Sequence, residues 1–103
     1  MIRIADIEIV CVAEFVALSG KERDLLETLH ELMKPTHQEP GYIRYELNVH
    51  IDDPRIVTFI EKFKSRAAFD EHCAMPYIKN YFDNQRPGLV ESFRVNLYRE
   101  VLP

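Results

Sequence analysis

The stretch "FIEKFKSRAAFDEHCAMPYIKNYF", residues 59–82, joins a strand pattern to two helix patterns with almost no linker. Its first residues continue a period-two alternation that begins at Ile56, which is typical of a β-strand. Ser65 is placed to cap a helix over residues 67–73. Pro76 favours the first turn of a further helix, whose apolar stripe is Tyr77, Ile78, Tyr81 and Phe82. The stretch therefore predicts a strand followed by a helix pair.

The N-terminal third predicts a strand and a helix. Residues 7–18 are apolar in both phases of a strand, so neither face of that strand is expected to be polar. Ser19 and Glu22 form a capping-box pattern, which satisfies free amide groups at a helix start. Apolar residues then follow at helical spacing, and Pro35 is expected to end the helix. These helical residues are Leu25, Leu26, Leu29, Leu32 and Met33.

Turns and alternations predict the remaining strands. Residues 39–41, "EPG", and 52–54, "DDP", are turn sequences. Between them, apolar and polar residues alternate along a predicted strand over residues 43–51. Its apolar phase is Ile43, Tyr45, Leu47, Val49 and Ile51. A last strand is expected over residues 91–101.

This order of elements predicts one domain over residues 1–103, with an α+β ferredoxin-like sandwich. The antiparallel sheet would carry all helices on one face. The other face would leave an apolar patch in water, which monomers seldom expose. That patch consists of Val10, Val12, Val16, Ile56 and Ile60. We therefore expect a homodimer whose sheets pack face to face.

Composition excludes several classes of partner. The net charge is −4 and the 13 basic residues are scattered, which argues against nucleic acid as a partner. No apolar stretch approaches the roughly 20 residues of a membrane span, and the N-terminus lacks a signal-peptide pattern. Cys11 and Cys73 have neither disulfide-framework nor metal-ligand spacing. We expect free thiols and a cytoplasmic location.

The runs "EPGYIRYEL" and "DDPRIVTFIEKFKSRAAFDEHCAMPYIKNY" resemble the antibiotic biosynthesis monooxygenase domain. The shared pattern is a Pro-Gly turn, a strand with Tyr, Glu-x-aromatic, Ser, Ala-aromatic, His and a Pro-aromatic helix start. The resemblance spans roughly residues 39–82. It implies a dimeric α+β barrel with a pocket between sheet and helices. It also implies, in many members, cofactor-independent oxygenation of quinols or polyphenols.

Two departures from this family matter. Many members carry Trp where this chain has Phe63, and the chain contains no tryptophan. Phe63 can form an apolar wall but cannot donate an indole hydrogen bond. Haem-degrading members place an iron-ligating histidine near the position of Tyr81, so haem is disfavoured and no cofactor is expected. His30 and His37 have no carboxylate at ligand spacing, so no metal site is predicted.

Glu61 and His72 are the candidate catalytic residues. Glu61 lies in the apolar phase of its strand, where an unpaired carboxylate is costly to bury. It could fix packing by pairing with a neighbour, or it could polarise a pocket. His72 follows Phe69 on the same helix face, and could be a packed core histidine or the proton-transfer group. The resemblance, which places a histidine at this position, favours proton transfer, with Glu61 setting its surroundings.

Aromatic residues are the candidate substrate-binding residues. Tyrosine offers an apolar ring and a phenol, which can orient a hydroxylated aromatic ligand, although core packing would also explain each residue alone. The set is Tyr45, Phe59, Phe63, Phe69 and Tyr77.

The sequence is compatible with three functions. The first is a monooxygenase that uses O₂ and a small quinol or polyphenol without a prosthetic group. The second is an isomerase of a small (phospho)carbonyl signal compound, which would need cationic groups at the pocket. The third is a non-catalytic dimer that binds a small ligand, which would show Glu61 and His72 locked together with no cavity beside them.

Overall fold

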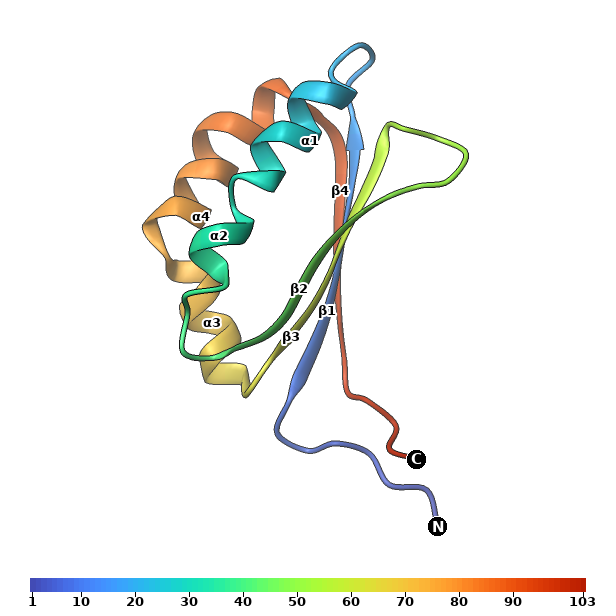
Figure 1. Cartoon of the computed structure of the whole chain (residues 1–103), viewed down its shortest axis with the longest axis vertical. Helices are drawn as coiled ribbons and strands as arrows, with labels where there is room; N and C mark the ends of the chain where they lie inside the picture. Colours follow the sequence, from blue (N-terminus) through green and yellow to red (C-terminus); the bar gives the residue numbers. More distant parts are fainter.

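A computed structural model describes residues 1–103 as a four-stranded antiparallel sheet covered by helices on one face (Figure 1). The strand order is β2-β3-β1-β4. The strands are β1 (Ile9–Ala17), β2 (Tyr42–Val49), β3 (Ile56–Phe63) and β4 (Val90–Tyr98). The helices are α1 (Glu22–His30), α2 (Met33–Thr36), α3 (Arg66–Ala74) and α4 (Pro76–Asn80). The predicted ferredoxin-like α+β sandwich is confirmed.

The two central strands separate the core from the open face. In β1 and β3, alternate residues are buried, and the residues between them are half-buried. The predicted phase of β3, with Phe59, Glu61 and Phe63 toward the helices, is confirmed because all three are at most 4% exposed. Leu25 and Leu29 of α1 pack into the same core and are fully buried.

The two helices after β3 begin as the sequence predicts. Ser65 Oγ accepts a hydrogen bond from the Ala68 amide at 3.1 Å and caps α3. α3 ends at Met75, which is extended, and Pro76 occupies the first turn of α4. α4 then continues as a π-helical segment, Tyr81–Gln85, and a 3₁₀ turn, Arg86–Gly88. This change of direction places α3 and α4 over different parts of the sheet.

The predicted start and end of the first helix are wrong. Its N-cap is Lys21, without a side-chain cap, because Ser19 and Gly20 form a turn in which Gly20 has φ +80°. Glu22 therefore stands at the first helical position, and its Oε2 is buried without a hydrogen-bond partner. Pro35 does not end the helical segment either. It lies in the first turn of α2, where its missing amide hydrogen breaks no helical hydrogen bond.

The strand boundaries also differ from those expected. The β2–β3 register shifts between Tyr42 and Arg44, so that Ile43 occupies a bulge and is exposed. The predicted apolar phase of β2 holds at Tyr45 and Leu47, whereas Val49 is exposed and Ile51 lies beyond the strand, also exposed.

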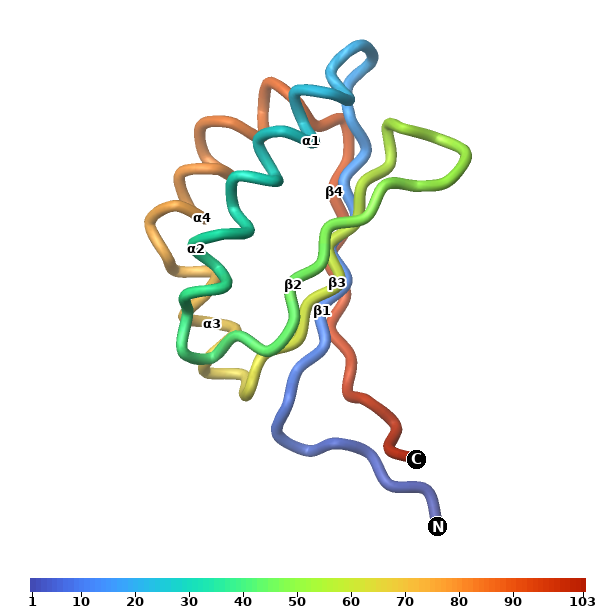
Figure 2. The backbone as a smooth tube through the Cα atoms, in the orientation of Figure 1, coloured from blue at the N-terminus to red at the C-terminus, as the bar shows by residue number.

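β1 and β4 are also shorter than predicted. Ile7, expected in the first strand, is exposed and lies before β1. β4 ends at Tyr98, and beyond it the chain makes an isolated antiparallel bridge between Ile4 and Val101. The two termini consequently lie side by side, below the sheet in Figure 2.

One glycine allows α3 to approach the start of β2. A Cβ atom at Gly41 would lie 2.3 Å from the Ala68 Cβ, which is far inside van der Waals contact. The Gly41 carbonyl also accepts a hydrogen bond from the Lys64 amide at 2.9 Å. The "EPG" turn thus holds its first residue, Glu39, beside α3.

The open face of the sheet carries the predicted apolar patch. Cross-strand neighbours on this face include the pairs Val12–Ile60 and Val16–Ile56. These four residues and Val10 are half-buried although no helix covers them. Glu14 and Thr58 lie between these two pairs, Arg94 of β4 lies beside Glu14, and Lys62 lies beside Val10.

Candidate functional site

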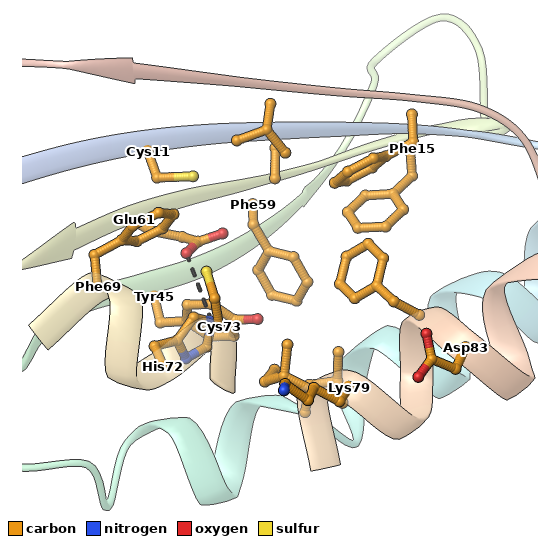
Figure 3. Close-up of a pocket in the computed structure, with 16 residues that line it drawn as sticks. Cys11, Phe15, Tyr45, Phe59, Glu61, Phe69, His72, Cys73, Lys79 and Asp83 are labelled. Atoms are coloured by element: carbon orange, nitrogen blue, oxygen red, sulfur yellow. Dashed lines mark ion pairs between the residues drawn. The ribbon is translucent and has the colours of Figure 1, made fainter. Parts of the chain in front are cut away.

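A cavity of about 290 Å³ lies between the sheet and the helices. Twelve of its 16 lining residues are hydrophobic. Figure 3 shows Glu61, His72, the two cysteines and Phe69 toward one end, and Phe59 and Phe15 toward the other. Lys79 and Asp83, which are both exposed, mark the side of the cavity bordered by α4 and the π-helical segment. The cavity therefore has one end with Glu61 and His72 and another that is mainly aromatic.

Glu61 and His72 meet at the polar end. Glu61 comes from β3 and His72 from the last turn of α3, and each residue is 4% exposed. Glu61 Oε1 lies 3.9 Å from His72 Nε2, which is too long for a hydrogen bond (Figure 3). The two side chains face one another across a short gap beside the cavity, and neither is locked by the other.

The other ring nitrogen of His72 is held by Glu39. His72 Nδ1 lies 3.0 Å from Glu39 Oε2 and 3.2 Å from Oε1. The Tyr77 hydroxyl also donates to Glu39 Oε2. A glutamate carboxylate only accepts hydrogen bonds, so the tautomer of His72 that bonds to it carries its hydrogen on Nδ1. In neutral His72 the lone pair is then on Nε2, toward Glu61 and the cavity.

A hydroxyl chain extends this arrangement away from the cavity. The Thr36 hydroxyl lies 3.2 Å from the Tyr77 hydroxyl and donates to the Leu32 carbonyl at 2.8 Å. Thr36 is fully buried at the end of α2. The short helix α2 thereby fixes Tyr77, and Tyr77 in turn helps to fix Glu39.

Burial keeps Glu61 protonated near neutral pH. Desolvation raises the pKa of the Glu61 carboxyl to about 8, and the nearby charge of Glu39 acts in the same direction. The Cys11 thiol, on the β1 residue that pairs with Glu61, lowers the pKa of the Glu61 carboxyl and so offsets this rise in part. At neutral pH Glu61 is therefore chiefly a carboxylic acid, which can donate a hydrogen bond to an oxygen in the cavity.

Burial also favours the neutral form of His72, which shifts its pKa in the opposite direction from that of Glu61. Desolvation lowers the pKa of the His72 imidazole, and the hydrogen bond and charge of Glu39 partly compensate. The ring packs against Phe63, with centroids 4.8 Å apart, and against Tyr45, at 5.3 Å. At neutral pH His72 is therefore chiefly a neutral base.

The remaining titratable groups at the polar end stay protonated. Burial, with the charge of Glu61 second, raises the pKa of the Cys73 thiol to about 11. The same two causes raise the pKa of the Tyr45 phenol and of the Cys11 thiol further. Proton transfer near neutral pH is thus left to His72 and Glu61.

The aromatic end is a set of packed phenylalanine rings. The ring of Phe15 lies 4.7 Å from that of Phe93, 6.1 Å from Phe82 and 6.3 Å from Phe59. Phe59 also stacks on Tyr45, with centroids 4.3 Å apart. These rings present an apolar surface suited to a flat aromatic ligand.

The structure brings five of the seven predicted site residues to the cavity. These are Glu61, His72, Tyr45, Phe59 and Phe69. Phe63 does not line the cavity, because it is fully buried behind the His72 and Phe69 rings. Tyr77 does not line it either, since its hydroxyl is directed to Glu39 and Thr36 on the opposite side of His72.

Glu39 is the site residue that the sequence analysis missed. It is the first residue of the predicted "EPG" turn, and its side chain is only 9% exposed. The signal that could have found it is Gly41: a glycine that packs on Ala68 brings the turn against the helix that carries His72.

No helix of the structure is long and apolar enough to cross a membrane. No group of three or more His, Cys, Asp or Glu side chains is arranged to hold a metal ion. Lys79 is the one cationic side chain that lines the cavity.

Comparison with known proteins gives a family match over most of the chain. The family described as antibiotic biosynthesis monooxygenase matches residues 8–84. A Mycobacterium tuberculosis protein named "Putative monooxygenase Rv0793" is 33% identical over 70 residues, which cover 68% of this chain and 68% of that protein. The chain spans about two thirds of the length of the curated relatives it matches, 65% in one and 68% in the other.

Solved structures share the fold. The crystal structure of protein SO0527 from Shewanella oneidensis is 50% identical, with a TM-score of 0.98 and 100% of both chains covered. A crystal structure described as antibiotic biosynthesis monooxygenase is 27% identical, with a TM-score of 0.82, covering 92% of this chain and 99% of that one.

Proposed function

The chain belongs to the antibiotic biosynthesis monooxygenase family, and we propose that it is a monooxygenase acting on a small quinol or polyphenol. The substrate binds in the cavity between sheet and helices, and O₂ is the oxidant. No prosthetic group is required, because an electron-rich hydroquinone can reduce O₂ once it has lost a proton. The protein supplies a base, a dry aromatic pocket and orientation.

One observation carries this proposal: Glu39 lies 3.0 Å from Nδ1 of His72, on the side away from an aromatic cavity, and leaves the other ring nitrogen toward that cavity. Glu39 accepts the Nδ1 proton of His72, so the basic Nε2 is directed toward the cavity. A quinol ring seated among Phe59, Phe15 and Tyr45 would present one hydroxyl to that nitrogen. His72 is the proposed proton-transfer residue, as the sequence analysis predicts.

Glu61 has a complementary proposed role. As a carboxylic acid near neutral pH, it donates a hydrogen bond to the phenolate oxygen formed when His72 takes the proton. Its carboxyl makes no hydrogen bond to a protein nitrogen, and His72 Nε2 lies 3.9 Å away. This leaves its donor free for a ligand. Tyr45, Phe59 and Phe69 form the proposed contact surface for the ring, whereas Phe63 and Tyr77 support His72 from behind.

The reaction balances without another reductant. A hydroquinone and O₂ give a hydroxyquinone and water: one oxygen atom forms a new bond to a ring carbon, and the other leaves as water. The ring supplies all four electrons. The hydrogens of the water come from the hydroquinone, and His72 carries the first of these protons.

The cavity supports this function over the two alternatives. A phosphorylated carbonyl compound would require converging cations, and only the exposed Lys79 lines the cavity. A binding protein without turnover would have Glu61 and His72 hydrogen-bonded to each other and no space beside them. They are instead 3.9 Å apart and border about 290 Å³.

The open face of the sheet supports a homodimer. Val10, Val12, Val16, Ile56 and Ile60 form an apolar patch without a covering helix, and a second copy of the same face would bury it. The proposed assembly has a mass of twice 12.2 kDa.

The test of activity is oxygen incorporation. Purified protein is supplied with 1,4-naphthohydroquinone, catechol or 1,2,4-trihydroxybenzene under ¹⁸O₂, and the products are analysed by mass spectrometry. The proposal expects one ¹⁸O atom in a hydroxylated quinone, formed faster than in protein-free buffer. Quinone without ¹⁸O, accompanied by hydrogen peroxide, would mean simple autoxidation and would contradict the proposal.

A further inference from the structure

His72 and Glu39 form the wall between the cavity and the molecular surface. His72 lines the cavity of about 290 Å³. Glu39 lines a separate surface groove of about 430 Å³, together with Pro35, Gln38, Pro40, Glu71 and Tyr77. The two side chains are in contact, so a single hydrogen bond connects the buried site to the groove.

The two ring nitrogens of His72 face these two compartments. Nε2 is directed toward Glu61, which lines the cavity and not this groove, at 3.9 Å. Nδ1 donates to Glu39 Oε2 at 3.0 Å. An imidazole in this position can accept a proton at one nitrogen and release another from the opposite nitrogen, without any movement of the ring.

A buried base needs such a connection. His72 holds the substrate proton while O₂ reacts, and the imidazolium is disfavoured there because the residue is 4% exposed. Glu61 cannot receive that proton near neutral pH, since it is already protonated. The positive charge on the ring is relieved if His72 passes its Nδ1 proton to Glu39.

We propose that Glu39 relays protons between His72 and the surface groove. The proposal rests on the proposed function, in which His72 accepts the substrate proton. Glu39 is not in contact with the cavity, and it acts only through His72.

The relay consists of two transfers. The quinol O–H bond breaks as its proton forms a bond with Nε2, and the Nδ1–H bond breaks as that proton passes to Glu39 Oε2. The quinol becomes a phenolate, His72 is neutral again in the opposite tautomer, and Glu39 is a carboxylic acid. When Nε2 gives its proton to the oxygen atom that leaves as water, Nδ1 takes a proton back from Glu39, and the starting state is restored. While it is protonated, Glu39 can exchange its proton with water in the groove.

Several other titratable groups surround these two residues. His72 is faced by Glu61 from β3 and Tyr45 from β2, with the Cys73 thiol beside it on α3. Glu39 is faced by the Tyr77 hydroxyl from α4, which Thr36 also contacts. Tyr77 donates to Glu39, and burial raises the pKa of its phenol, so it supports the carboxylate and does not compete for the relayed proton.

The Glu39→Gln variant distinguishes a proton relay through Glu39 from a role in which Glu39 only orients the His72 ring. The glutamine carbonyl can still accept the Nδ1–H bond and hold the ring, but it cannot take up the proton. Glu71→Gln is the matched control, because Glu71 lines the same groove from α3 and is exposed. With ¹⁵N-histidine labelling, NMR measures exchange of the His72 Nδ1 proton with water and needs no substrate.

We expect this exchange to slow by about tenfold or more in Glu39→Gln and to stay unchanged in Glu71→Gln. Equal exchange rates in the wild type and Glu39→Gln would overturn the relay, whatever the activity of the protein. In the ¹⁸O₂ assay, kcat should fall by a similar factor with little change in KM, and formate should restore it. A fall in kcat that formate does not restore, with normal exchange, would mean that Glu39 only orients His72.

The two proposals fail in different ways. Wild-type protein that incorporates no ¹⁸O would contradict the proposed function, while the exchange measurement would still decide whether Glu39 connects His72 to solvent.

Discussion

The two faces of the sheet are made from alternate residues of the same strands, but they differ in burial, in packing and in the polar groups that they carry. In β3, Val57, Phe59 and Phe63 are buried under the helices, whereas Ile56 and Ile60 face outward and remain half-buried. The helix-covered face combines tight packing with a cavity and a buried pair of titratable groups. The open face has an apolar patch without a cavity in its centre. A strand with apolar residues in both phases thus contributes to the core on one side and to the proposed dimer interface on the other.

The largest expected difference between the faces is in stability. Phe63→Ala should lower the free energy of unfolding by about 3–5 kcal/mol, because it removes a fully buried ring that packs on His72 and Phe69. Thr58→Ala, on the opposite face of the same strand, should change it by no more than about 0.5 kcal/mol. Urea titrations at one fixed protein concentration measure both values. Similar losses in the two variants would show that the faces are not energetically distinct.

Dimer formation, unlike stability, should depend mainly on the open face. Val12→Asp places a carboxylate in the middle of the open face, beside Ile60 and Asn96. We expect it to weaken the proposed dimer by at least about a hundredfold, since an unpaired charge in an interface costs several kcal/mol. Light scattering at micromolar concentration should change from twice 12.2 kDa to 12.2 kDa, while circular dichroism stays the same. A wild-type protein that is itself monomeric would remove the proposed role of this face.

The pH dependence of activity gives the smallest expected effect and concerns only the helix-covered face. The proposed active form has neutral His72 and protonated Glu61, so kcat/KM should decline above about pH 8, where Glu61 ionises, by about tenfold per pH unit. Because burial lowers the pKa of His72, the acidic limb should lie below the usual range of a histidine. Glu61→Gln should remove the alkaline limb. If that limb persists in the variant, Glu61 is not the hydrogen-bond donor.

The sequence predicted the periodic parts of this molecule and missed those that depend on tertiary contacts. Alternation gave the correct phase for Glu61, and Ser65 and Pro76 marked the right helix starts, because each of these signals is local. The capping box failed because the positive φ of Gly20 turns the chain before Lys21, so Ser19 never reaches the helix. The bulge at Ile43 depends on pairing with β3 and has no local signature.

In the candidate site, too, local sequence signals identified some residues, and tertiary contacts hid another. Sequence spacing identified Glu61 and His72, which their elements bring to one end of the cavity. Glu39 could not be found in this way, because 33 residues separate it from His72 and only the packing of Gly41 on Ala68 brings the two together. Tyr77 was expected beside a substrate, whereas its hydroxyl turns toward Glu39.

The central claim is that His72 is the base on the helix-covered face. The most direct test compares His72→Ala with His30→Ala, whose histidine is exposed in the last turn of α1, by measuring quinol-dependent O₂ consumption. His72→Ala should lower turnover by about a hundredfold or more, the usual scale for removal of a general base, while His30→Ala should keep wild-type turnover. Circular dichroism and light scattering should show both variants folded and associated like the wild type. A folded His72→Ala variant with unchanged turnover would contradict the account and leave the aromatic cavity as the sole source of activity.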